Sequence, residues 1–220
     1  MSGDAVFDFA RAERIGLSEA VFCAGKTPQQ IASILESARV RDAGLLLTRL
    51  NSEKFEALPG DLRALTDWCP LSQTAFFGPV PPVSSTGTVA IVAAGTSDAP
   101  AAREAERTLR HAGVEASVII DVGVAGLWRL MDRIEEIRRF PVVIAVAGMD
   151  AALASVLGGL YGGSLICVPT SVGYGAAEEG RTALNAMLAG CAPGLLVTNI
   201  DNGYGAACAA LRMLGVMKLR

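Results

Sequence analysis

The sequence predicts an α/β fold with a doubly wound parallel sheet and a smaller N-terminal α/β region. From Thr88 onward, five short apolar runs alternate with five segments of helical pattern, which is typical of a parallel sheet with helices on both faces. The composition agrees, because 51% of the residues are apolar but only 5% are aromatic. Cores rich in Ala, Val, Gly and Leu suit closely packed, buried parallel strands.

A linker divides the chain. Residues 79–87 hold three prolines, two serines and a glycine, and such a segment has few groups that can join a sheet. We therefore expect an N-terminal α/β region over residues 1–78, a linker over 79–87 and a core domain over 88–220.

The N-terminal region carries one strong helix signal, at Thr27-Pro28-Gln29-Gln30. Thr27 is a good N-cap, Pro28 suits the first helical position, and Gln30 completes a capping box. That helix is expected to run to about Ala43. The other elements expected here are a helix over 5–14, a strand over 45–50 and a helix within 52–65 that breaks near Pro59-Gly60.

The core domain is expected to alternate strands with helices. The strands are expected over 88–94, 115–121, 141–147, 164–168 and 195–200, and the helices over 99–112, 125–140, 149–160, 176–189 and 204–214. Residues 151–177 form a long uncharged run, but glycines and a proline interrupt it. We expect two shorter elements there rather than a membrane-spanning helix.

Charge and cysteine usage exclude several classes of protein. A net charge of −3 offers no basic face for nucleic acid. The first residues lack the pattern of a signal peptide. The five cysteines are odd in number and none forms a C-x-x-C pair, which indicates reduced thiols in the cytoplasm and no zinc site. His111 is the single histidine, and we expect a structural role for it near a helix end.

All five expected strands end in Gly together with Asp, Ser or Thr. Carboxyl ends of parallel strands share one edge, and open sheets bind their ligands there. We therefore predict a functional site at this edge, although turns favour the same residue types. The segments are Gly95-Thr96-Ser97-Asp98, Asp121-Val122-Gly123, Gly148-Met149-Asp150, Pro169–Gly175 and Asp201–Gly205.

The first of these segments is a candidate phosphate site. A strand that turns through Gly95 into a helix presents backbone N–H groups to an anion. Thr96 and Ser97 add hydroxyl donors, and Asp98 can cap the helix. The same residues fit a plain capped turn equally well.

Several charged residues are candidates for binding or catalysis. Asp150 suits a general base or a helix cap. Asp98, Asp121 and Asp201 share the predicted edge and together can hold Mg²⁺ through water against phosphate oxygens. Lys26 and Arg49 are either phosphate contacts or solvated surface charges.

Cys191 lies in the turn Gly190-Cys191-Ala192-Pro193-Gly194. We expect this turn to expose the thiol beside the strand-end edge, where a lowered pKa makes it a nucleophile. The alternative is a small apolar filler, a common role of cysteine. Cys167 and Cys208 lie mid-strand and mid-helix, which favours the core, and Cys23 and Cys69 fit either role.

The chain resembles the phosphoribosyl-aminoimidazole carboxylases of purine synthesis. The motifs that carry this likeness are Gly95-Thr96-Ser97-Asp98, Ala147–Leu153 and Pro169-Thr170-Ser171. The family has a catalytic histidine in its third glycine-rich loop. Aligning the Ala-Gly pair places Ala152 at that position, so the sequence departs from the family where its chemistry needs an imidazole.

A closer resemblance, to the pyridinium-3,5-biscarboxylate mononucleotide synthases (LarB), covers nearly the whole chain. The motifs that carry it are Gly25–Pro28, Thr48-Arg49, Gly148-Met149-Asp150, Pro169–Gly175, Cys191-Ala192 and Asn199–Gly205. The resemblance implies a PurE-like three-layer core. It also implies carboxylation of nicotinate adenine dinucleotide by CO₂ or bicarbonate and release of AMP, a step in nickel-pincer cofactor synthesis.

By this resemblance, Cys191 is the nucleophile and Asp150 the proton acceptor. Mg²⁺ assists cleavage of the phosphoanhydride, and the chains form a homo-oligomer, an octamer or a tetramer. The alternatives are an aminoimidazole ribonucleotide carboxylase or mutase, and a non-catalytic nucleotide-binding regulator. The expected substrate-binding residues are Lys26, Arg49, Gly95, Thr96, Ser97, Asp98, Gly148, Met149, Thr170, Ser171, Asn199, Asp201 and Asn202.

Overall fold

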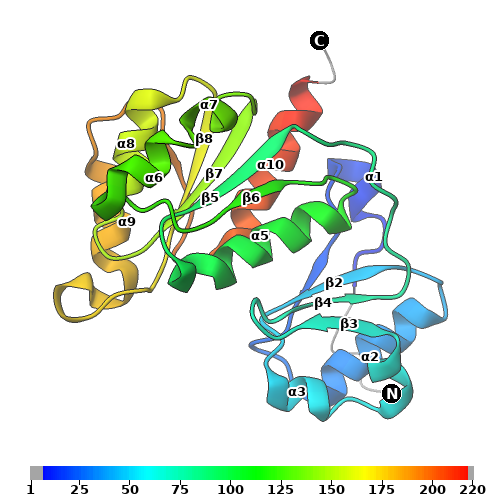
Figure 1. Ribbon diagram of the computed structural model, residues 1–220. Helices are drawn as coiled ribbons and strands as arrows, with labels where there is room; N and C mark the ends of the chain where they lie inside the picture. The colour runs from blue at the N-terminus through cyan, green and yellow to red at the C-terminus, as the bar shows by residue number, and fades with distance from the viewer. Residues whose placement is uncertain (1–6, 218–220) are drawn as a thin grey trace. The chain divides into compact units, whose positions relative to one another are not determined.

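The computed structural model of the protein describes residues 7–217 (Figure 1). The chain divides into two compact units. The first comprises residues 1–82 with 111–113, and the second comprises 83–110 with 114–220. Each unit contains a sheet of its own, four-stranded in the first and five-stranded in the second.

The sheet of the first unit has the order β1-β2-β4-β3. β1 (Ala20–Phe22) pairs in parallel with β2 (Leu45–Thr48), and α2 connects the two strands. β4 (Thr74–Phe77) pairs antiparallel with both β2 and β3 (Thr66–Cys69). The first unit is therefore a parallel β-α-β element extended by a hairpin.

The helices of the first unit are α1 (Arg11–Ile15), α2 (Pro28–Arg39), α3 (Ser52–Glu56) and α4 (Gly60–Ala64). The capping box of α2 is confirmed: Gln30 N–H donates to Thr27 Oγ1 at 3.2 Å, and Thr27 N–H donates to Gln30 Oε1 at 3.0 Å. The break near Pro59-Gly60 is also confirmed, since it separates α3 from α4. In place of the helix expected over 5–14, the structure has α1 (Arg11–Ile15). Residues 5 and 6 of the expected helix lie outside the described residues.

The local sequence pattern predicts only one strand in this unit, β2. The hairpin β3-β4 depends on partners distant in the chain: Trp68 Nε1–H donates to Leu50 O at 2.9 Å, and its ring stacks on Phe55 with centroids 4.5 Å apart. Short strands have weak local patterns, and pairing across the sheet stabilises them.

The second unit confirms the doubly wound parallel sheet. Its strands are β5 (Val89–Ala93), β6 (Ser117–Ile119), β7 (Val142–Ala147), β8 (Ser164–Pro169) and β9 (Leu196–Val197). They pair in parallel in the order β6-β5-β7-β8-β9. β6 and β9 are shorter than expected because both lie at the edges of the sheet.

Two of the expected helices are wrong in detail. The single helix expected over 125–140 is divided into a 3₁₀ turn, α6 and α7, and the one expected over 176–189 begins with a 3₁₀ segment in which Glu178 and Glu179 adopt left-handed conformations. The helical segments are η1 (Thr96–Asp98), α5 (Ala99–His111), η2 (Val124–Gly126), α6 (Leu127–Met131), α7 (Ile134–Ile137), α8 (Ala152–Leu160), η3 (Gly175–Gly180), α9 (Arg181–Ala189) and α10 (Gly203–Met217).

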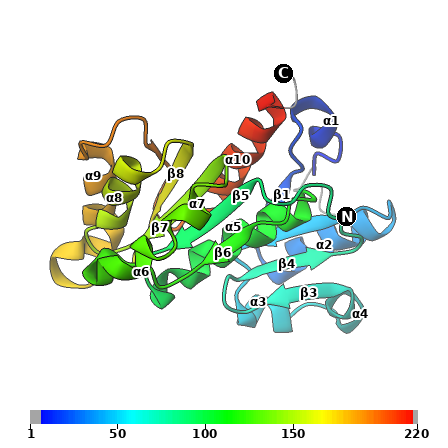
Figure 2. The ribbon, with the colours of Figure 1, turned by 45° about the horizontal axis from the view of Figure 1, so that its top comes forward.

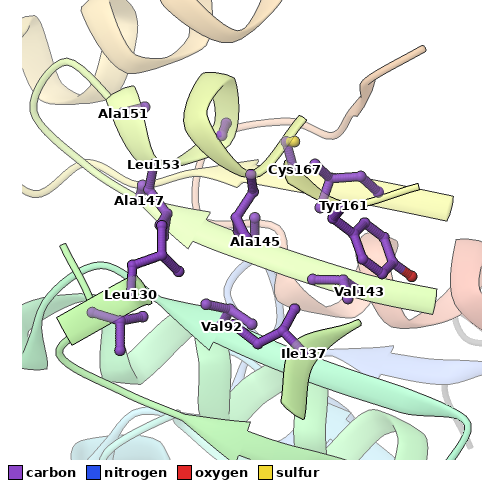
Figure 3. Close-up of a cluster of buried hydrophobic side chains, with 14 of the residues drawn as sticks. Val92, Leu130, Ile137, Val143, Ala145, Ala147, Ala151, Leu153, Tyr161 and Cys167 are labelled. Atoms are coloured by element: carbon purple, nitrogen blue, oxygen red, sulfur yellow. The ribbon is translucent and has the colours of Figure 1, made fainter. Parts of the chain in front are cut away.

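The core of the second unit lies on both faces of the sheet. All five residues of β5 are completely buried. Val89, Ile91 and Ala93 pack with α5 and α10, whereas Ala90 and Val92 pack with α6 to α9 (Figure 2). Figure 3 shows part of the second of these groups of buried side chains, the one that contains Val92, around β7. Because successive strand side chains alternate between faces, this unit has the three layers of a doubly wound fold.

The uncharged run over residues 151–177 contains α8 and β8, as expected. Within residues 7–217, no helix is both long enough and apolar enough to cross a membrane.

Candidate active site

The loops that follow β5, β7, β8 and β9 meet at the carboxyl edge of the parallel sheet, here called the rim. Ser171 N–H, after β8, donates to Asp201 Oδ1, after β9, at 2.9 Å. Met149 N–H, after β7, donates to Val172 O at 2.8 Å. The predicted convergence of these segments is therefore present.

Asp98 joins three of these loops. Its Oδ2 accepts a hydrogen bond from Gly95 N–H at 2.9 Å, and its Oδ1 accepts one from Thr170 Oγ1–H at 2.6 Å. The backbone N–H of Gly148 also bonds to this carboxylate. Asp98 is only 4% exposed, so in this conformation it organises the loops after β5, β7 and β8.

The electrostatics of Asp98 follow from its burial. Loss of solvent raises the pKa of the Asp98 carboxyl above its ordinary value, and the hydrogen bonds from Thr170, Gly95 and Gly148 oppose that rise. The charge of Asp201 raises the pKa further. A buried carboxylate that accepts several hydrogen bonds is held rigidly, because breaking one of them leaves a buried polar group unpaired and without compensation for its desolvation.

Gly148 is required at the centre of the rim. A methyl group at this position would lie 2.5 Å from both Thr170 Oγ1 and Val172 O. The backbone of Gly148 therefore approaches the β8 loop too closely for any side chain. This contact supports a structural role for Gly148 that the sequence analysis does not predict.

The backbone of the rim is strained at several residues. Asp121, Met149, Ala151 and Asp201 have φ angles of 68°, 55°, 55° and 54°. Such left-handed conformations cost of order 1 kcal/mol outside glycine and gather at functional sites. Asp121 and Met149 among them are exposed, whereas Ala151 is buried, and the packed loops must offset the energetic cost of these conformations.

The expected substrate-binding residues of the rim fall into two groups. Asp98 and Thr170 are buried, whereas Gly95, Gly148, Asp201 and Asn202 are half-buried. The exposed members, which a ligand can reach, are Thr96, Ser97, Met149, Ser171 and Asn199. Asp150 is also exposed, and its Oδ1 accepts a weak hydrogen bond of 3.3 Å from Ala152 N–H.

Glu104 is a rim residue that the sequence analysis missed. It lies on α5, is 3% exposed, and its Oε2 accepts a hydrogen bond of 3.2 Å from Tyr204 N–H at the start of α10. A carboxylate at a helix N-terminus is favourable. The signal in the sequence was an acidic residue on the same helix face as Ala101 and Ala105, a face that is buried in the structure.

The predicted magnesium ligands do not form a protein-built metal site. Asp98 uses both oxygens within the protein, Asp121 pairs with Arg129 at 2.8 Å, and Asp201 accepts from Ser171. Among the described residues there is no group of three or more His, Cys, Asp or Glu side chains that could hold a metal ion. The residues present therefore do not fit Mg²⁺ without further ligands.

Cys191 is exposed, as predicted, but the expectation that it lies beside the rim is wrong for a single chain. β8 and β9 are parallel, so α9 must return the chain from the rim to the amino edge of the sheet. Cys191 follows α9 and precedes β9. In Figure 1 the orange segment after α9 lies at the opposite end of the sheet from the gold segment η3.

The contacts of the turn agree with this position. A methyl group at Gly158, near the end of α8, would lie 2.5 Å from Ala192 Cβ. Asp150 precedes the start of the same helix. At ~1.5 Å per helical residue, about 12 Å of helix axis separates Asp150 from the level of Cys191. One chain therefore does not bring these two candidate catalytic residues together.

The other cysteines are less suited to nucleophilic chemistry. Cys23 and Cys167 are completely buried, and loss of solvent raises the pKa of each thiol to about 12. Cys69 and Cys208 are half-buried. Among the described cysteines, Cys191 is the exposed one.

Lys26 and Arg49 lie in the first unit, at one edge of its sheet. β1 and β2 are parallel neighbours, and Lys26 and Arg49 follow their respective carboxyl ends. Cys23 N–H donates to Thr48 O at 2.9 Å, and Lys26 N–H donates to Cys23 O at 3.1 Å. Two cations therefore follow adjacent strand ends, close to the start of α2.

Comparison with known proteins gives the family. Residues 88–220 match the family model of AIR carboxylase, and residues 1–75 match that of the LarB/PurE-like N-terminal domain. The chain belongs to the AIR carboxylase family. It combines a PurE-like core with an N-terminal domain of the LarB/PurE-like type.

A relative from Methanocaldococcus jannaschii is described as the uncharacterized protein MJ0165. It is 46% identical to this chain over 126 residues, which is 56% of this chain and 48% of the relative. The matched part spans about half the length of that relative, and its description assigns no activity.

Proposed function

We propose that this AIR carboxylase family member carboxylates the pyridinium ring of nicotinate adenine dinucleotide and hydrolyses its phosphoanhydride. The products are pyridinium-3,5-biscarboxylate mononucleotide and AMP. The observation that carries the proposal is the presence of a LarB/PurE-like N-terminal domain and an AIR carboxylase core in one chain. An exposed thiol in a Gly/Pro turn supports it.

The chemistry assigns a role to Cys191. A pyridinium ring is electron-poor and does not attack CO₂. Addition of the Cys191 thiolate forms a C–S bond and converts the ring to a dihydropyridine, whose enamine carbon attacks CO₂. Asp150 then accepts the proton from that carbon, and departure of the thiolate breaks the C–S bond and restores the aromatic ring.

The rim supplies binding groups for the rest of the dinucleotide. Exposed hydroxyls of Thr96, Ser97 and Ser171 suit phosphate and ribose oxygens, and Asp98 keeps their loops in register. Water cleaves the phosphoanhydride and releases AMP. Since the described carboxylates do not form a metal site, no step of this scheme is assigned to Mg²⁺.

The proposed reaction requires a second copy of the chain. The thiolate and the base must act on neighbouring atoms of one ring, whereas Cys191 and Asp150 lie near opposite ends of α8. A homo-oligomer that places Cys191 of one copy at the rim of another resolves this separation. Exposed Leu127, Trp128 and Met131 on α6 add apolar surface that suits self-association.

The first experiment incubates the protein with nicotinate adenine dinucleotide and bicarbonate, with and without Mg²⁺, and identifies the products by mass spectrometry. AMP with a biscarboxylated mononucleotide is the expected result. Turnover of aminoimidazole ribonucleotide instead would favour a purine carboxylase. Binding of the dinucleotide without any product would favour a regulator.

The second experiment tests the shared site. Asp150→Ala and Cys191→Ala are each expected to be inactive, and co-expression of the two variants is expected to form mixed oligomers with some intact sites. Recovered carboxylation in the mixture supports a site built from two copies. An inactive mixture, with mixed oligomers confirmed by differently tagged chains, would contradict it.

A further inference from the structure

Helix α8 contains two adjacent glycines, Gly158 and Gly159, in its last turn. Glycine inside a helix costs about 1 kcal/mol relative to alanine, so each glycine needs a separate explanation. Their surroundings differ sharply. A methyl group at Gly159 would meet nothing within 4 Å, whereas one at Gly158 would lie 2.5 Å from Ala192 Cβ and 3.1 Å from Leu195 Cδ2.

Gly158 thus faces the turn that carries Cys191. Ser155, one helical turn earlier on the same face, contacts the other side of this turn, because a methyl group at Gly190 would lie 3.1 Å from Ser155 Oγ. The residues on both sides of Cys191, Gly190 and Ala192, therefore rest on α8. Cys191 between them is exposed.

The far end of the turn is anchored in the core. Leu195 packs against the cluster of buried residues beneath α8 and α9, and Leu196 continues into β9 opposite Ile166. Gly194 has a φ of 81°, which reverses the chain where L-residues are strained. The turn cannot move outward at Ala192 without disturbing one of these anchors.

We propose that Gly158 is a positioning residue for the Cys191 nucleophile. It leaves the space that Ala192 occupies and so determines how far from α8 the thiol lies. This inference rests on the proposed function, in which Cys191 must reach a ring carbon of the substrate. Displacement of a reacting group by about 1 Å can lower a rate by ~10²-fold.

The test compares Gly158→Ala with Gly159→Ala, because both changes add the same methyl group to adjacent helical positions. Two quantities are measured. The first is the rate at which iodoacetamide alkylates Cys191, determined by peptide mass spectrometry with Cys69 as the internal reference. The second is kcat for carboxylation, together with KM for the dinucleotide and the melting temperature of each variant.

The expected result for Gly158→Ala is a severalfold change in Cys191 alkylation relative to Cys69 and a loss of kcat of about tenfold or more. KM is expected to change little, because the phosphate contacts of the dinucleotide are expected on the rim loops, which this substitution does not alter. Gly159→Ala is expected to leave both rates near wild type. Adding Ala192→Gly to Gly158→Ala removes the clashing methyl group and is expected to restore both rates.

Equal alkylation and equal kcat in the two glycine variants would overturn the inference. So would failure of Ala192→Gly to rescue a folded Gly158→Ala protein. Absence of carboxylation in the wild type is a different outcome: it overturns the proposed function, while the alkylation rates still decide whether Gly158 positions the turn. If Gly158→Ala does not fold, recovery of folding and thiol reactivity in the double variant supports the same contact.

Discussion

The two edges of the parallel sheet are built in opposite ways. At the rim, the central carboxylate of Asp98 is buried and hydrogen-bonded to loops from three strands. At the amino edge, Cys191 is exposed in a short turn that rests on α8. The rim is therefore suited to hold a ligand rigidly, and the amino edge to present a reactive group to a molecule outside the chain.

In the proposed function, this difference separates substrate binding at the rim from covalent chemistry by the thiol. A buried network preorganises groups because its members cannot relax without losing hydrogen bonds. An exposed thiol remains available to solvent and to a second copy. Substitutions at the two edges are therefore expected to have different effects.

The largest effect is expected at the amino edge. Cys191→Ala should lower carboxylation by orders of magnitude, because it removes the covalent route. Dinucleotide binding should persist, since the phosphate contacts are expected at the rim. Product formation is measured by mass spectrometry and binding by calorimetry.

Cys167→Ala is the matched control on the sheet itself. It removes a small buried group, so it should cost about 1 kcal/mol of stability and leave the chemistry intact. Near-normal product from a folded Cys191→Ala protein would rule out the covalent mechanism and direct attention to Cys23, Cys69 or direct base catalysis.

The next effect is expected at the rim. Asp98→Ala removes the acceptor of Thr170 Oγ1–H and Gly95 N–H, which should lower the free energy of unfolding by ~1–3 kcal/mol and weaken dinucleotide binding. Glu178→Ala, at an exposed position of η3, should change stability by less than about 0.5 kcal/mol. Calorimetric titration measures the dinucleotide affinity of each variant, and urea unfolding measures its stability. Equal dinucleotide affinity in the two variants would remove Asp98 from the site.

A smaller effect is expected from pH. Because burial raises the pKa of Asp98 in the folded state, the folded protein binds that proton more tightly than the unfolded chain does. This contribution to stability is complete below the unfolded pKa, ~3.9 for Asp, and is lost as the pH rises through the folded pKa. Asparagine does not ionise, so Asp98→Asn lacks this pH-dependent contribution to stability.

The corresponding measurement is urea unfolding of both proteins from about pH 3.5 to 7. The stability of the wild type minus that of Asp98→Asn should fall over this interval and level off above the folded pKa. A difference that stays constant, or rises with pH, would contradict the buried placement of Asp98.

The smallest effect on the folded sheet is expected from cleavage of the linker. Residues 79–87 are mostly exposed, and exposed Pro/Ser/Gly segments are preferred sites of nicking. Brief proteolysis should cut there first and leave both edges of the sheet intact, as judged by mass spectrometry of the fragments. A first cut inside residues 95–210 would contradict this boundary.

Prediction from the sequence succeeded where the signal is local. The capping box at Thr27 requires only neighbouring residues, and the apolar runs of β5, β7 and β8 reflect burial on both faces of the sheet. Prediction failed where the stabilising contacts come from residues distant in the sequence, as in the hairpin β3-β4. It also failed for the helix expected over 125–140, whose breaks lie between residues with ordinary helical composition.

Short segments are enough to predict the parallel fold, the composition of the rim and the resemblance to the family, because apolar periodicity and glycine-containing motifs are local properties. The burial and position of individual groups depend instead on contacts between distant parts of the chain. Asp98, predicted as a helix cap and substrate-binding residue, is buried in the folded chain and links three loops. The direction of β9 placed Cys191 at the amino edge, because each parallel strand requires the chain to return before it can begin.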